Sequence, residues 1–168
     1  MACRAVHFAL TAEQASRFLD IPDGDNESLR AFVEEIEEGA DGEGWDEEWT
    51  QETDKAWDAI HRCLTDGKLE HGDTPFHKCI LGPVNLYYDD DYIINFLAPE
   101  EVKEVAAAIK DIDREWLRRK YDAIDTKSYQ GVLSDSDFKY TWSWFPHLRE
   151  FFQKAAAADR AMLFTVDQ

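Results

Sequence analysis

Four polar residues near the middle of the chain combine the spacing of one helix face with the functional groups of an acid–base site. They fall at positions i, i+4, i+7 and i+11 and are Asp54, Asp58, His61 and Thr65. A carboxylate one turn from an imidazole can fix the tautomer of that ring, raise its pKa or join it in binding a metal. Asp58 and His61 are therefore the candidate catalytic pair of a small enzyme or ligand-binding protein.

The competing interpretation of His61 is structural. Trp57 lies four residues earlier, so the imidazole borders an aromatic stripe of the predicted helix. A histidine in such a position can pack between elements and hydrogen-bond to backbone groups. The two interpretations differ in whether His61 lines a concave pocket or sits in a closed core.

Other metal-binding side chains lack the spacing of zinc sites. His71, His77 and Cys79 match no usual structural zinc arrangement. His61 and Cys63 lie two residues apart, so on a helix they point to different sides. We therefore expect no zinc ion, and nothing in the sequence indicates a nucleophilic thiol at Cys63.

One segment partly matches a calcium-binding loop. Residues 23–34 place acids at ligand positions 1, 3, 5 and 12, namely Asp23, Asp25, Glu27 and Glu34. However, Ser28 replaces the glycine that the sharp turn requires, and apolar residues at helical spacing make 29–36 a helix. Residues 89–100 have the same acidic spacing but run through an apolar stretch. Because nucleotide-binding and esterase motifs are also absent from the sequence, we expect no metal and no cofactor.

The negative charge of the protein is concentrated in one sector. The net charge is −18, and residues 20–58 hold 16 acidic residues against Arg30 and Lys55, a net charge of −14. Such a field repels nucleic acids and anionic membranes, and it attracts basic proteins. The first interpretation is an interaction module of the inhibitor or immunity type that docks on a basic protein. The alternative is a solvated face that only keeps the protein soluble.

The candidate partner-binding residues come from the middle of this sector: Glu34, Glu38, Trp45, Glu47 and Glu48. Trp45 lies in an acidic, glycine-rich loop at 39–46, where a tryptophan beside charged residues has the composition of an interface hot spot. It can also fold back onto its own domain.

The pattern of apolar residues predicts an α+β fold with a small mixed or antiparallel sheet and about six helices. We expect strands near 3–10, 79–88, 92–97 and 161–166, with the last pairing with the first or its neighbours. Thr11 and Gln14 form a capping box, and Pro99 and Asp113 mark two later helix starts. Helices are expected at 12–21, 28–38, 47–65, 99–109 and 114–121, and Pro146 begins or kinks a last one. Residues 138–144 also fit a strand, and Pro83 makes 79–88 an edge or irregular segment.

Length and cysteine content fit one soluble domain over residues 1–168. No apolar run approaches the length of a membrane span, and the first residues lack the form of a secretory signal. Three cysteines without a CxxC pair (Cys3, Cys63 and Cys79) indicate free thiols in a reducing cytoplasm. We expect a cytoplasmic monomer or weak oligomer.

The order of these segments resembles the YfbM-like family of bacterial proteins. The matching segments are KAWDAIHRCLTD at 55–66, Ile80-Leu81-Gly82, APEEVKEVAAAI at 98–109, Tyr121-Asp122, and Lys154-Ala155-Ala156 before the last strand. Two positions depart from the family pattern, with Asp66 in place of a glycine and Gln130 in place of a proline. The resemblance implies an α+β domain over the whole chain, and it supplies no activity, cofactor or catalytic residue.

Overall fold

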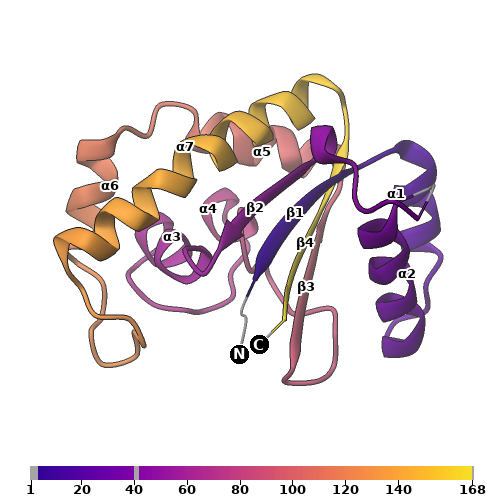
Figure 1. Cartoon of the computed structure of the whole chain (residues 1–168), viewed down its shortest axis with the longest axis horizontal. Helices are drawn as coiled ribbons and strands as arrows, with labels where there is room; N and C mark the ends of the chain where they lie inside the picture. Colours follow the sequence, from indigo (N-terminus) through magenta and orange to yellow (C-terminus); the bar gives the residue numbers. More distant parts are fainter. Residues whose placement is uncertain (1–3, 40–41, 168) are drawn as a thin grey trace.

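The computed structural model describes residues 4–39 and 42–167, and the predicted Cys3 thiol lies outside them. It has an α+β architecture, as predicted, with a four-stranded antiparallel sheet in the order β2-β1-β4-β3. Seven α-helices and one 3-10 helix, η1, occur in the described residues (Figure 1). The elements are β1 (Ala5–Leu10), α1 (Ala12–Leu19), α2 (Asn26–Glu38), η1 (Glu47–Trp49), β2 (Thr50–Asp54), α3 (Trp57–Leu64), α4 (Pro75–Lys78), β3 (Tyr92–Leu97), α5 (Pro99–Ile109), α6 (Arg114–Tyr121), α7 (Asp135–Ala157) and β4 (Ala161–Asp167).

The two central strands are β1 and β4, and they pair as the sequence predicts. Their register runs from Ala5 opposite Val166 to Leu10 opposite Ala161. All six residues of β1 and the first six of β4 are buried. Both strands are buried on both faces because helices cover the sheet on each side.

One side of the sheet carries α1 and α2, and the other carries α3 to α7 (Figure 1). On the first side Phe18 of α1 and Phe32 of α2 pack against Phe8 and Leu163. On the second side the long helix α7 buries Phe145 and Phe152 in a larger core. Helix α2, which belongs to the acidic sector, therefore lies across the sheet from most of the helical mass.

Helix boundaries set by local chemistry are confirmed. Thr11 and Gln14 form the capping box, with Gln14 N–H 3.1 Å from Thr11 Oγ1 and Thr11 N–H 2.8 Å from Gln14 Oε1. Pro99 begins α5, and the Asp113 carboxylate caps α6. None of the helices within 4–39 and 42–167 is both long and apolar enough to cross a bilayer.

The predicted helix over 47–65 is wrong in its first half. Residues 47–49 form η1, residues 50–54 form β2, and only Trp57–Leu64 is helical. The apolar residues of this stretch do repeat at helical spacing, but Glu52 and Gln51 pair with β1, opposite Val6 and His7. A tertiary strand pairing thus overrides the local period.

The predicted strand at 79–88 is also wrong, and its alternative as an irregular segment holds. Residues 79–91 form turns beside β3, where side chains replace most of the backbone ladder. The Asn95 amide donates to the carbonyl of Ile80 at 3.0 Å, and Asn85 Oδ1 accepts from Ile94 N–H at 2.9 Å. Pro83 has no N–H to offer a strand partner.

Gly82 in this segment makes a strong stability prediction. Its φ is +65°, and a Cβ there would lie 2.3 Å from Asn95 Oδ1. We expect Gly82→Ala to lower the free energy of unfolding by about 2–3 kcal/mol, since backbone strain adds to a steric clash. Gly42→Ala is the matched control, because its φ is +69° and no atom lies within 4 Å of the added Cβ. Urea unfolding that shows equal losses for both variants would contradict the clash.

The region around Pro146 forms one continuous helix. Residues 138–144, which also fitted a strand, belong to the 23-residue α7, and Pro146 lies inside that helix. Phe138, Phe145 and Phe152 recur at seven-residue intervals on its buried face, so packing holds the helix across the proline.

Candidate functional site

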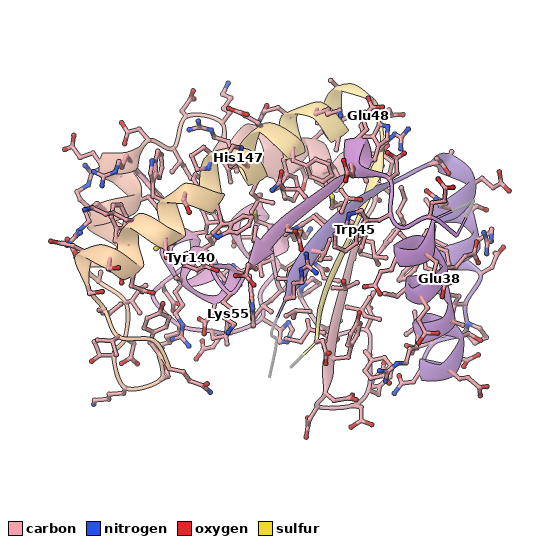
Figure 2. The ribbon with its side chains drawn as sticks, in the orientation of Figure 1. Glu38, Trp45, Glu48, Lys55, Tyr140 and His147 are labelled. Carbon is pink, nitrogen blue, oxygen red and sulfur yellow. The ribbon has the colours of Figure 1, made fainter. Side chains whose placement is uncertain are left out.

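The acidic sector of the sequence separates into two surfaces in the fold. Residues of α2 and Trp45 lie on the α1/α2 side of the sheet. Glu48 of η1 contacts Lys154 of α7. Asp54 ends β2 and Asp58 lies in the first turn of α3, on the side covered by α7. Figure 2 shows this separation, with Glu38 on α2 and Lys55 with Tyr140 near the start of α7.

Asp58 and His61 do not form the predicted acid–base pair. The Asp58 carboxylate accepts a hydrogen bond from Arg62 Nε at 2.5 Å. His61 is fully buried, with Nε2 2.8 Å from the Glu70 carbonyl oxygen, and Nδ1 has no hydrogen-bond partner among the described residues. Burial lowers the pKa of His61 to about 4, so the ring is neutral at physiological pH. The structural interpretation of His61 fits this geometry.

Asp58 instead lines a cleft of about 600 Å³ between α3, the start of α7 and the loop that precedes α7. Its lining combines polar and apolar residues: Lys55, Ala56, Trp57, Asp58, Leu69, Tyr129, Gln130, Gly131, Asp137, Tyr140 and Thr141. The volume lies in the range of small-molecule sites. Asp54, the other acid of the predicted stripe, is not a lining residue of the cleft. It accepts a hydrogen bond at 2.5 Å from the hydroxyl of Tyr140, which lines the cleft.

Behind the cleft, a buried arginine organises the loop. Arg62 is 2% exposed, donates to Ser128 Oγ at 2.8 Å and to the Ser128 carbonyl at 3.1 Å, and lies 5.5 Å from the Tyr129 ring centre. These bonds fix the loop that carries Tyr129 against α3. The sequence analysis did not select Arg62, although its i, i+4 spacing from Asp58 could have indicated an ion pair between them.

Two tyrosines share one carboxylate at the opposite wall. The hydroxyls of Tyr121 and Tyr129 donate to Asp137 Oδ2 at 2.5 and 2.8 Å. Burial, with Asp137 second, raises the pKa of both tyrosines far above the ordinary value. Asp137, Tyr140 and Thr141 share a helix face, which the sequence could have indicated, but nothing local indicates that this face meets Asp58.

Burial raises the pKa of Asp58, and its contact with Arg62 opposes that rise. The charge of Asp137 raises the pKa of Asp58 by a smaller amount, because repulsion between two carboxylates disfavours the ionised form. The negative charge of the cleft is therefore only partly balanced by the Arg62 guanidinium.

On the other surface, Glu34, Glu38, Glu47 and Glu48 are exposed, as a docking face requires. Two of these glutamates and the nearby Glu35 form ion pairs that partly neutralise them. Glu35 pairs with Arg17, Glu34 with Arg30 at 3.7 Å, and Glu48 with Lys154 at 3.5 Å.

Trp45 is half-buried rather than fully exposed. Its ring packs edge-on to Phe8 with centroids 6.0 Å apart, and the Arg4 guanidinium lies 5.3 Å from its ring centre. It lines a hollow of about 420 Å³ between α2 and the sheet, together with Arg4, Val6, Arg30, Val33, Glu34, Glu37, Tyr92 and Asp167. Burial raises the pKa of Glu37, and the charges of Glu34 and Asp167 raise it further.

The part of the chain that the structure describes contains no cluster of metal-binding side chains, and its two cysteines are buried. No group of three or more histidine, cysteine, aspartate or glutamate side chains there could hold a metal ion. Asp25, a candidate calcium ligand, caps α2 by accepting from Ser28 N–H. Cys63 and Cys79 are free and buried, and burial raises the pKa of Cys63 to about 12, so it is a poor nucleophile.

Comparisons with known proteins identify the family and the fold. A family model described as "Domain of unknown function (DUF1877)" matches residues 1–165. The crystal structure of YfbM from Escherichia coli, a protein of unknown function, superposes with a TM-score of 0.68 at 13% sequence identity. The match covers 97% of this chain and 99% of that one, and it confirms the predicted resemblance at the level of fold. No curated protein matches the chain.

Proposed function

The chain belongs to the DUF1877 family, whose description assigns no activity, and from its own surface we propose an acidic interaction module that docks on a basic protein. The observation that carries the proposal is the group of carboxylates on α2 and the 42–48 segment, two of which, Glu34 and Glu37, line the hollow at Trp45. Together they form the acidic face, defined here as Glu34, Glu37, Glu38, Trp45 and Glu47.

The hollow suits a cationic side chain of the partner. Its two arginines already have partners, since Arg4 pairs with Glu52 and Arg30 with Glu34 and Asp91. Burial raises the pKa of Glu37, and the charges of Glu34 and Asp167 raise it further, so a lysine or arginine placed there would stabilise its carboxylate. The rings of Trp45 and Tyr92 add aromatic surface for such a group.

A face of this kind also favours rapid, steered association. Dense carboxylates can imitate the charge of phosphates, so a basic nucleic-acid-binding surface is the partner that we propose. The module would then act as an inhibitor or immunity-type factor that shields that surface.

We expect neutralisation of the acidic face to weaken binding of a lysine-rich peptide. The triple variant Glu34→Gln, Glu38→Gln, Glu47→Gln should lose about tenfold in affinity at low salt, since each rim charge contributes on the order of 0.5 kcal/mol. Isothermal titration calorimetry at two salt concentrations measures the loss and its screening.

The control removes the same charge elsewhere. Glu104, Asp111 and Glu150 are exposed on or next to helices of the other side, and Glu104→Gln, Asp111→Asn, Glu150→Gln changes the net charge equally. An equal loss in this control would show that only net charge matters, and the proposed face would be rejected.

A further inference from the structure

We propose that the cleft at the start of α7 binds a small organic ammonium ion with an aromatic or aliphatic body. The cleft lies on the opposite side of the sheet from the acidic face, so this second site goes beyond the proposed function and does not depend on it. Figure 2 shows its rim, where Tyr140 of α7 and Lys55 before α3 come together, and the Lys55 N–H lies 3.3 Å from the Tyr140 hydroxyl oxygen.

The hydroxyl groups in the wall donate their protons to the protein. Tyr140 donates to Asp54, Tyr129 to Asp137, and Thr141 Oγ1 to the Asp137 carbonyl oxygen at 2.9 Å. What they still offer to the cleft is lone pairs. A ligand that contacts these hydroxyls is therefore met by acceptors and must itself be a hydrogen-bond donor there.

The charge of the wall selects a cation among donors. Asp58 and Asp137 line the cleft, and Asp54 lies behind Tyr140. Arg62 offsets one of these charges but binds Asp58 through Oδ1, and Asp58 Oδ2 makes no hydrogen bond within the described residues. An ammonium ion between Asp58 and Asp137 would donate to both carboxylates and relieve their repulsion.

Aromatic and aliphatic side chains supply the rest of the site. Trp57, Tyr129 and Tyr140 place three rings in the wall, and Leu69 adds an apolar surface. Rings of this kind attract cations through their faces and cover an apolar body. Lys55 is the cationic side chain among the lining residues, and it is exposed at the rim rather than enclosed.

Three matched probes of one shape test the charge selection. Benzylammonium, benzyl alcohol and benzoate can each be titrated into the full chain while amide NMR shifts are recorded. We expect benzylammonium to shift amides at 55–58, 69 and 129–141 and to bind about tenfold more tightly than benzyl alcohol. Benzoate that binds as tightly as benzylammonium at these positions would overturn the proposal.

Two substitutions test the residues. Asp137→Asn keeps an oxygen that accepts from Tyr121 and Tyr129 but removes the charge, and it should weaken benzylammonium binding about fivefold or more. Lys55→Glu changes an exposed side chain, so it keeps the test valid if Asp137→Asn does not fold. It should tighten benzylammonium binding several-fold, whereas Lys110→Glu, with the same charge change on exposed surface after α5, should not. Equal affinities in both lysine variants would contradict the site.

Discussion

Replacing Asp58 with alanine is expected to lower the free energy of unfolding by about 3 kcal/mol or more, because it leaves the buried Arg62 guanidinium without a carboxylate partner. The Arg62 side chain is 1% exposed and Asp58 is its carboxylate partner. Its remaining partners, Ser128 and the Gly67 carbonyl oxygen at 3.4 Å, carry no charge. Urea unfolding at neutral pH measures the loss.

The double variant Asp58→Ala, Arg62→Met distinguishes the loss of the Asp58–Arg62 ion pair from the cost of burying an unpaired guanidinium. It removes the guanidinium along with the carboxylate, so we expect it to recover at least half of the stability that Asp58→Ala loses. A double variant no more stable than the single one would show that Arg62 tolerates burial without Asp58.

Mild acid is expected to destabilise the protein through two buried histidines. Burial lowers the pKa of His7 and of His61 from an ordinary value of 6.5 to about 4 in each case. Between these pH values the unfolded chain binds protons that the folded chain does not, so stability is full above pH 6.5 and falls as the pH drops. Each histidine should remove about 2 kcal/mol by pH 5.

Unfolding free energies at pH 7.5, 6.0 and 5.0 test this prediction. His61→Gln can still donate to the Glu70 carbonyl but does not titrate, and it should remove about half of the loss between pH 7.5 and 5.0. His147 lies exposed on α7, so His147→Gln should leave the pH dependence unchanged. A loss that is the same in all three proteins would assign the acid sensitivity to other groups.

The parts of the fold that local chemistry decides were predictable from the sequence. Thr11 with Gln14, Pro99 and Asp113 set helix starts through bonds or backbone angles within three residues. Strand β2 was not predictable in this way, because Trp49, Thr53, Ala56 and Trp57 also fit a helix. Its conformation is decided by pairing with β1, more than 40 residues earlier.

The candidate sites show the same division. The count of charges located the acidic sector, whose exposed Glu34 and Glu38 lie on α2. The sequence could not show that Asp54 and Asp58 leave that surface, because their partners are brought in by the fold. Tyr140 is 86 residues from Asp54, and Ser128 is 66 residues from Arg62. Helical spacing suggested an Asp58–His61 pair, whereas the observed partner, Arg62, lies one residue further along.

We propose that one of the two surfaces into which the acidic sector divides, the acidic face, docks a basic partner. The most direct test is an amide-resolved NMR titration of the chain with a lysine-rich peptide. We expect shifts confined to α2, residues 42–48 and neighbouring β1 residues, and we expect them to shrink as salt is added. Shifts centred on 55–58 and 129–141, or binding indifferent to salt, would contradict it.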